Sequence, residues 1–436
     1  MIGLPAGTRA VDPWQAIARF GLGRRPSEPL PADPRGWLLD QLDGDDPLAG
    51  AGPSTAAGLV ALRTDRRDKP PAAASQSRTI FLDGANVQLI AALTSATPFR
   101  ERLVWFWCNH FTVSVRRAAC AAVLPAFVSE AIRPHVTRRF ADMLQAVMRH
   151  PAMLLYLDNA GSIGPDSPVG QRRHRGLNEN LARECLELHT LSPAASYTQA
   201  DVTAFAAILT GWSVDLAADP PGFRFRSAMH EPGPNTLLGR QFPAGEAGGL
   251  AALDFLATHP ATYRFLATNL ARHFVADEPA SADIARIEAV LARTGGDLGA
   301  AARCLVTLDA AWQPHGKLRT PHDLMIAGLR ALELPPDRAG IMLGELAAMG
   351  QPLWSAPAPN GWPDQAAEWA APEAMLRRVD WAYGLAGRAG QVEPETLAGD
   401  VLGPLLQPAT RQAMQRAGSR RDALTLLFAS PEFQRR

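Results

Sequence analysis

The sequence predicts a mainly α-helical protein. It predicts a single large helical domain over residues 1–436, with long polar loops and at most a small β-hairpin near residues 223–242. Apolar residues recur with helical spacing along most of the chain. The composition, 47% hydrophobic and 20% charged residues, is that of an ordinary globular protein. No segment repeats with a period of about 20 to 50 residues, which disfavours a solenoid.

The helices expected in the first part of the chain are short near the N-terminus and strongly apolar after residue 98. They cover residues 14–20, 37–42, 80–96, 98–113, 118–132, 140–149 and 151–157. Residues 63–78 combine several charges with two prolines and small residues, which predicts a solvated, mobile connector. Pro125 and Pro134 are expected to break or kink their segments.

Three polar loops interrupt the helices of the second part. They are expected at about residues 159–177, 214–247 and 350–371. Thr198, with Asp201 three residues later, is typical of a helix N-cap. Residues 223–226 alternate with period two, and residues 236–242 are expected to pair with them in one hairpin. The other expected helices cover residues 178–190, 199–210, 253–274 with an interruption at Pro260, 284–294, 298–308, 320–332 and most of the last 65 residues.

Charge and composition exclude several classes of protein. Lys plus Arg and Asp plus Glu are both 43, so the net charge is zero, which disfavours nucleic-acid binding. No apolar run approaches the ~20 residues of a membrane span. The four cysteines match no zinc module or disulfide framework, so we expect reduced thiols. Residues 1–14 show no secretory signal, which predicts a cytoplasmic protein unless a leader was removed.

Common catalytic fingerprints are also absent from the sequence. It contains no phosphate-binding P-loop and no Rossmann glycine pattern after a strand. It contains neither the H-E-x-x-H helix of zinc proteases nor a G-x-S-x-G nucleophile elbow. Any chemistry must therefore come from side chains that lie far apart in the sequence.

The helix expected at residues 178–190 carries the first candidate site. With about 100° per residue, four polar side chains fall within a sector of about 100°: Asn180, Arg183, Glu184 and Glu187. The two glutamates could share an ion or a substrate, and His189 joins them only if the helix ends before it. The alternative is a solvated helix face with a pair between Glu179 and Arg183.

Other polar residues stand at conspicuous places. Asn109 and His110 lie in an apolar, aromatic helix, where His110 is either a metal ligand or general base, or a core histidine with a structural partner. His230 lies on a loop rich in proline and glycine. Lys317, Asn360 and Trp362 are candidates for substrate binding.

A series of short segments runs along nearly the whole chain: Ala18–Gly21 with Gly23, Glu101–Val104 with Phe106–Trp107 and Asn109–Phe111, Asn178–Asn180 with Ala182–Glu184 and Glu187–Leu191, Tyr197–Gln199 with Asp201–Val202, Leu209–Trp212, His230 with Gly233 and Leu238–Gly239, Leu270–Phe274, Lys317 with Pro321, and Asn360–Pro363 with Trp369. In this order they resemble the bacterial family called domain of unknown function 1800.

The resemblance implies little about activity, because the function of the family is unassigned. Members often occur beside a secreted, sulfatase-like family, which implies a shared extracytoplasmic pathway. This chain departs from the family pattern at Glu231, where Asp is expected, and at Asn235, where Lys is expected. The family pattern is rich in polar residues from distant segments, which favours a real site.

Two functions of different classes follow. The first is an enzyme, a hydrolase or group-transfer enzyme acting on a small or polymeric anionic substrate, with a divalent zinc, manganese or iron ion as the expected cofactor. The second is a scaffold whose Glu, Arg and His network is structural and whose tryptophan-rich loop near Asn360 docks a protein partner.

The enzyme hypothesis assigns a role to each candidate residue. The catalytic residues would be Glu184, Arg183 and His110; the substrate-binding residues Asn180, Lys317, Asn360 and Trp362; and the metal ligands Glu184, Glu187, His189 and His230.

Overall fold

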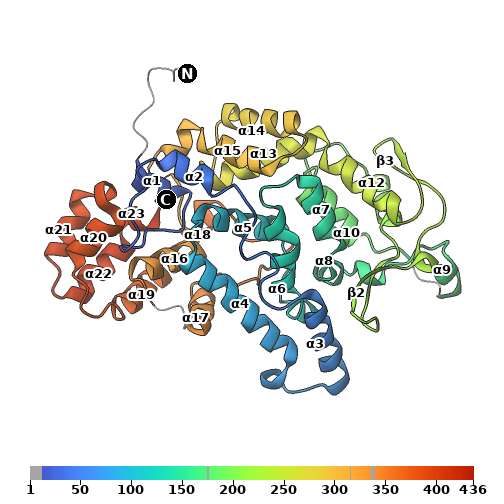
Figure 1. Cartoon of the computed structure of the whole chain (residues 1–436), viewed down its shortest axis with the longest axis horizontal. Helices are drawn as coiled ribbons and strands as arrows, with labels where there is room; N and C mark the ends of the chain where they lie inside the picture. Colours follow the sequence, from blue (N-terminus) through green and yellow to red (C-terminus); the bar gives the residue numbers. More distant parts are fainter. Residues whose placement is uncertain (1–11, 174–175, 315, 335–338) are drawn as a thin grey trace.

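The computed structural model describes residues 12–173, 176–314, 316–334 and 339–436 (Figure 1). The chain is mainly helical, which confirms the predicted fold class. The helices of the first part are α1 (Pro13–Arg19), α2 (Pro34–Asp40), α3 (Thr55–Asp68), α4 (Gln76–Thr94), α5 (Pro98–His110), α6 (Leu124–Ala126), α7 (Phe140–Arg149), α8 (Pro151–Tyr156), α9 (Pro168–Arg173) and α10 (Asn180–Glu184).

The second part adds two small sheets and the remaining helices. The strands are β1 (Trp212–Asp215), β2 (Gly222–Phe225), β3 (Asn235–Leu237) and β4 (Arg240–Phe242). The helices are α11 (Gln199–Ile208), α12 (Glu246–Ala257), α13 (Pro260–Phe274), α14 (Ser281–Thr294), α15 (Leu298–Val306), α16 (Pro321–Ala331), α17 (Ala339–Ala348), α18 (Ala366–Trp369), α19 (Pro372–Ala386), α20 (Pro394–Leu402), α21 (Pro408–Gln415), α22 (Arg420–Ala429) and α23 (Pro431–Gln434).

Proline and a capping side chain start many of these helices. Thr320 caps α16 directly before Pro321, and His259 caps α13 before Pro260, so the interruption predicted at Pro260 is confirmed. Thr198 and Asp201 form the capping box predicted for α11. After Pro125 the backbone becomes π-helical over Phe127–Ile132, which confirms the expected irregularity.

Two neighbouring hydrophobic clusters form the core. The first contains residues of α7, α8, α11, α12, α13 and α15, and the second contains residues of α4, α16, α17, α19, α20 and α22. Helix α5 lies between them, because Phe106 belongs to the first cluster and Trp105 packs against the second.

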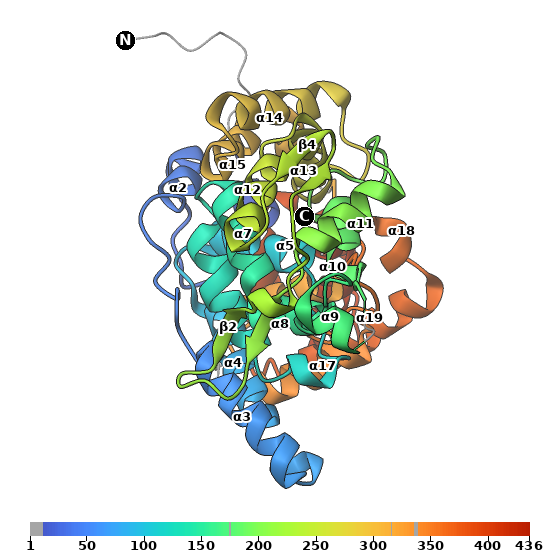
Figure 2. The same cartoon turned by 90° about the vertical axis from the view of Figure 1, so that its right-hand side faces the viewer.

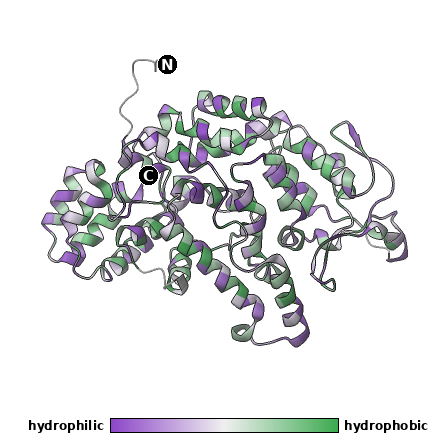
Figure 3. Cartoon of the chain, viewed as in Figure 1, coloured by the Kyte–Doolittle hydropathy of each residue, from purple (hydrophilic) through white to green (hydrophobic). Residues whose placement is uncertain are grey.

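Figures 1 and 2 place α13 to α15 at one edge and α3 at the opposite edge. Figure 3 shows apolar and polar residues mixed along each helix. A single domain stays a prediction.

The strands form two separate hairpins instead of the single pairing that was predicted. Strand β1 pairs with β2, and β3 pairs with β4, so residues 223–225 face residues 212–214 and not 236–242. Local pairing closes shorter loops and costs less chain entropy. Leu238 and Gly239, with φ of 50° and 76°, form the tight turn of the second hairpin.

The connector between α3 and α4 is shorter than the predicted residues 63–78. Helix α3 continues to Asp68 and ends at Lys69, which has a left-handed backbone, and α4 begins at Gln76. The Asp65 carboxylate accepts hydrogen bonds from Ser75 and from the backbone N–H groups of Gln76 and Ser77. These bonds hold the intervening residues in a defined turn.

The predicted polar loops keep some regular structure. The first contains α9, the second contains most of both hairpins, and the third is irregular until α18 begins at Ala366. Residues 174 and 175 of the first loop, and residues 1–11 of the N-terminal segment, lie outside the described residues. Within the described ranges, no helix is long and apolar enough to cross a bilayer.

A buried ion-pair network fixes the position of α5. Arg133 has no exposed surface, and its guanidinium donates to both carboxylate oxygens of Glu101 at 2.8 and 2.6 Å. It also donates to the side-chain oxygen of Gln88 on α4 and to Asp46. These contacts join α4, α5 and the segment before Phe140. Removal of one charged partner would leave the other charged groups buried without a counter-charge.

We expect Arg133→Ala to lower the free energy of unfolding by about 3–5 kcal/mol, because Glu101 and Asp46 would lose their buried partner. Chemical denaturation monitored by circular dichroism measures this. Arg138→Ala is the control, since Arg138 pairs with Asp45 at the surface and its loss should change little. Equal effects of the two substitutions would contradict the assigned role of Arg133.

Candidate active site

A cavity of about 100 Å³, the first cavity, lies between α5, α13, the start of α16 and the irregular segment 351–365. Helix α5 supplies Arg102, Trp105 and the adjacent Cys108 and Asn109, at steps of about one turn, so one helix face forms one wall. Its polar and aromatic lining residues include Arg102, Trp105, Cys108, Asn109, Thr112, His273, Thr320, His322, Asp323, Gln351, Trp354, Trp362 and Asp364.

His273 and Asp364 form a hydrogen-bonded pair in the wall of the first cavity. The Nδ1–H of His273 donates to the two carboxylate oxygens of Asp364, at 2.8 and 3.0 Å. Burial lowers the pKa of His273 despite the adjacent carboxylate. Burial alone would raise the pKa of Asp364, but His273 and Lys317 hold it below its usual value. A neutral imidazole therefore faces an ionised carboxylate, and its lone pair is on Nε2.

Four buried polar atoms in this wall have no hydrogen-bond partner among the described residues. They are Nε2 of His273, Nε2 of His322, and the indole nitrogens of Trp105 and Trp354. Burial lowers the pKa of His322 to about 4, and its ring packs on Trp105 with a centroid distance of 4.1 Å. An unpaired buried polar group costs about 1–3 kcal/mol.

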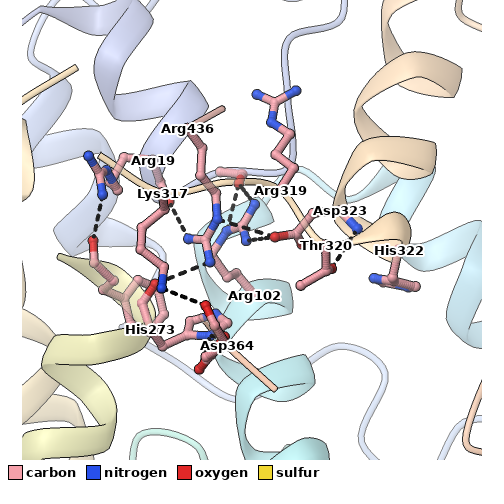
Figure 4. Close-up of polar contacts among 12 residues, drawn as sticks. Arg19, Arg102, His273, Lys317, Arg319, Thr320, His322, Asp323, Asp364 and Arg436 are labelled. Atoms are coloured by element: carbon pink, nitrogen blue, oxygen red, sulfur yellow. Dashed lines mark hydrogen bonds and ion pairs between the residues drawn. The ribbon is translucent and has the colours of Figure 1, made fainter. Parts of the chain in front are cut away.

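The cavity borders a cluster of buried basic side chains (Figure 4). Arg102 and Arg436 both contact one carboxylate oxygen of Asp323, at 3.0 and 3.2 Å. Burial, and then neighbouring guanidinium groups, lower the pKa of Arg19 and of Arg319 to about 9. The cluster holds five basic groups and three carboxylates: Arg19, Arg102, Lys317, Arg319 and Arg436 against Asp277, Asp323 and Asp364. An excess of basic groups favours an anion nearby.

A second cavity of about 310 Å³ lies on the other side of the segment 351–365. Asn109 forms part of both walls: its amide donates to the carbonyl of Trp362 at 2.8 Å and accepts from the Trp362 N–H at 2.7 Å. Gly361 makes this approach possible, because its φ is 76° and an added Cβ would lie 2.6 Å from the carbonyl oxygen of Asn109. The second cavity is lined by Phe106, Asn109, His110, Leu188, Phe265, Asn269, Arg272, Asn360, Trp362, Pro363, Asp364 and Gln365.

Comparison with known families matches residues 15–435 to the family described as protein of unknown function (DUF1800). The chain belongs to the DUF1800 family. The match covers nearly the whole chain and confirms the resemblance carried by the segments from Ala18 to Trp369. Searches among curated proteins and among solved structures found no match.

Four of the predicted site residues lie at or next to the two cavities. Trp362 lines both cavities, and Asn360 and His110 line the second. Lys317 is 1% exposed and lines neither; its ammonium donates to Asp277 and to the backbone carbonyl of Asp364. Lys317 therefore positions the segment that carries Asp364 and does not itself face a substrate.

His110 is a half-buried, neutral histidine in this DUF1800 chain. Burial lowers its pKa to about 4. Its Nε2–H donates to the carbonyl oxygen of His189 at 3.1 Å, so its lone pair is on Nδ1. The structural partner that was one alternative for His110 is thus present, while its place in the second cavity leaves a binding role open.

The predicted Glu and Arg face lies away from both cavities. It is helical as expected, with α10 followed by a π-helical segment over Cys185–His189. Arg183 donates to Glu179 and to Gln199, both at 3.0 Å, and lies 3.8 Å from Glu187. These contacts join α10 to α11. Asn180 is exposed, and Glu184 is half-buried beside Glu187, where burial raises its pKa.

The four predicted metal ligands are not brought together. His189 is fully buried between His110 and Phe111, with neither ring nitrogen hydrogen-bonded among the described residues. His230 uses both nitrogens: Nδ1–H donates to the carbonyl of Thr210 at 2.8 Å, and Nε2 accepts the N–H of Gly245 at 2.7 Å. His230 therefore ties the hairpin loop to α11. The described residues contain no group of three His, Cys, Asp or Glu side chains that could hold a metal ion.

Sequence patterns did not predict His273 and Asp364, the central pair of the candidate site. His273 and Asp364 are 91 residues apart, so no spacing pattern connects them. Two of the family segments in the sequence lie at these residues. His273 lies in the family segment Leu270–Phe274, and Asp364 directly follows the family segment Asn360–Pro363. Asn109, which joins both cavities, is the direct neighbour of the predicted His110.

We expect acid to destabilise the fold through buried histidines. Burial lowers the pKa of His110 to about 4 and that of His189 to about 3, from an ordinary value of 6.5. The unfolded chain therefore binds protons that the folded chain excludes, so their contribution is complete above pH 6.5 and is lost as the pH falls toward 4. Denaturant titrations at several pH values measure this, and His189→Gln should flatten the slope. An unchanged slope would contradict the assignment.

Proposed function

We propose that this protein is a hydrolase or group-transfer enzyme that acts on an anionic substrate, with His273 as the general base. The observation that carries the proposal is the pair of His273 and Asp364, which leaves Nε2 of His273 as an unpartnered lone pair in a cavity wall. A general base needs a neutral form at working pH and an orienting partner. Both conditions are met by the lowered pKa and the Asp364 carboxylate.

In this proposal each neighbouring group has a defined task. Nε2 of His273 takes a proton from water or from a substrate hydroxyl, and the Asp364 carboxylate stabilises the imidazolium that forms. The indole N–H groups of Trp105 and Trp354 are free to donate to a substrate oxygen. The basic cluster around Asp323 favours negative charge in the cavity, both in the substrate and as it develops during reaction.

The segment that carries Asp364 is held at two points. Lys317 donates to the Asp364 carbonyl at 2.7 Å and also contacts Asp277. Asp277 in turn accepts the backbone N–H of Ala366 at 2.7 Å, at the start of α18.

The expected outcome of His273→Gln is a loss of hydrolysis by about 100-fold or more, because proton transfer by a positioned base contributes that factor. The assay follows release of nitrophenol from p-nitrophenyl phosphate, sulfate and acetate. Asp364→Asn should lose activity as well, since the amide no longer stabilises the imidazolium.

His135→Gln serves as the matched control, because His135 is half-buried, binds the Ala131 carbonyl and lines neither cavity. Melting curves of all variants separate loss of chemistry from loss of fold. Wild-type rates in His273→Gln would refute the assigned base.

A divalent metal ion is a separate part of the proposal. Burial, and then the neighbouring Glu187 carboxylate, raise the pKa of Glu184. A zinc, manganese or iron ion bound there would favour the charged form of Glu184. Mass spectrometry of untagged protein should find near-stoichiometric metal that Glu184→Gln loses. Metal-free wild-type protein that hydrolyses the same esters would contradict a metal-dependent reaction.

The second candidate function is a scaffold, and one observation favours it. Glu179, Arg183 and Gln199 join α10 to α11 as a structural network would. In that case Glu179→Gln lowers the melting temperature, because Arg183 and Gln199 lose their shared carboxylate partner. Glu184→Gln then leaves the metal content unchanged, and His273→Gln leaves the rate of ester hydrolysis unchanged. The partner would dock at the segment around Asn360, which is exposed.

A further inference from the structure

Arg272 is a basic residue without a protein partner in the wall of the second cavity. It lies near the end of α13, and its guanidinium makes no hydrogen bond, ion pair or ring contact with any described residue. Its Nε is buried without a partner. By contrast, Arg264 on the same helix donates to Glu288 at 2.9 Å. A planar guanidinium with all its donors free matches a carboxylate or phosphate group.

Three side-chain amides of the same cavity are equally free. The amides of Asn269, Asn360 and Gln365 make no hydrogen bond within the described part of the chain. Asn269 precedes Arg272 by three residues on α13, so both lie on one helix face. An amide both donates and accepts, as a hydroxyl group does. Three free amides in one cavity therefore match a ligand with several hydroxyl groups.

Aromatic side chains supply the remaining walls. Phe265 lies one turn before Asn269 on α13, and Trp362 lies in the segment that separates the cavities. Their apolar faces suit the C–H face of a ring-shaped ligand. The volume of about 310 Å³ lies at the lower end of the range for small-molecule sites, roughly 300–1,000 Å³.

We infer that the second cavity binds a sugar that carries an anionic group, either a sugar acid or a sugar phosphate. Arg272 holds the anionic group, the amides hold the hydroxyl groups, and the ring lies against Phe265 or Trp362. Asp364 is the acidic residue of this wall, and its carboxylate is occupied by His273. This inference rests on the proposed function, because the anionic sugar would be the substrate class of the proposed enzyme. Binding is measured without turnover, so the sugar can bind even if His273 is not the general base.

The test is binding of D-glucuronate, D-glucose 6-phosphate, D-glucose and inorganic phosphate to the full chain, by saturation-transfer NMR and calorimetry. Glucuronate or glucose 6-phosphate should bind at least about tenfold more tightly than glucose, because a hydrogen-bonded charge contributes about 1.5–3 kcal/mol. Which of the two binds better identifies carboxylate or phosphate as the anionic group. Phosphate alone should bind more weakly than glucose 6-phosphate, because it lacks the ring and the hydroxyl groups.

Variants locate the binding site. Arg272→Gln should weaken binding of the anionic sugar about tenfold or more, and Asn269→Ala should weaken it to a smaller extent, with melting temperatures near wild type. Arg264→Gln, two turns away on the same helix, should leave affinity unchanged. Absence of binding by both anionic sugars at millimolar concentration, equal binding of glucose, or wild-type affinity in Arg272→Gln would each overturn the inference. His273→Gln should abolish ester hydrolysis yet keep this binding, which separates the two proposals.

Discussion

A single buried carboxylate joins the segments on which both cavities depend. Asp323, at the start of α16, contacts Arg102 from α5 and Arg436 from the last described residues. Arg102 also donates to the carbonyl of Gly21, and Arg436 donates to the carbonyls of Arg19 and His273. Burial would raise the pKa of Asp323, but these guanidinium groups keep the carboxyl ionised. Without this charge, several basic groups would remain buried with too few partners.

The two cavities near this carboxylate are lined by different polar groups. The first cavity offers an oriented imidazole and indole donors, whereas the second offers free amides and a free guanidinium. Asn109 and Trp362 line both cavities, and paired hydrogen bonds join the Asn109 amide to the backbone of Trp362.

Local sequence signals predicted the helices well, because caps and prolines act within a few residues. Thr198 with Asp201, and His259 with Pro260, start helices where they were expected. The charges of residues 63–68 do not mark a connector, because they lie on the exposed face of α3, which continues to Asp68. The site was only partly predictable: the Glu184 face is a genuine helix face, yet His273 and Asp364 meet only through tertiary packing.

The contrast between the two lysines of this chain has a practical consequence. Lys317 is buried at 1% exposure, with its ammonium bound to the Asp364 carbonyl, while Lys69 is exposed at the end of α3. Acylating reagents need an accessible, unprotonated amine, so among the lysine side chains they should modify Lys69 alone. Among the lysine side chains, a fluorophore or surface anchor is therefore attached only at the end of α3, on the edge of the molecule opposite α13 to α15 (Figure 2).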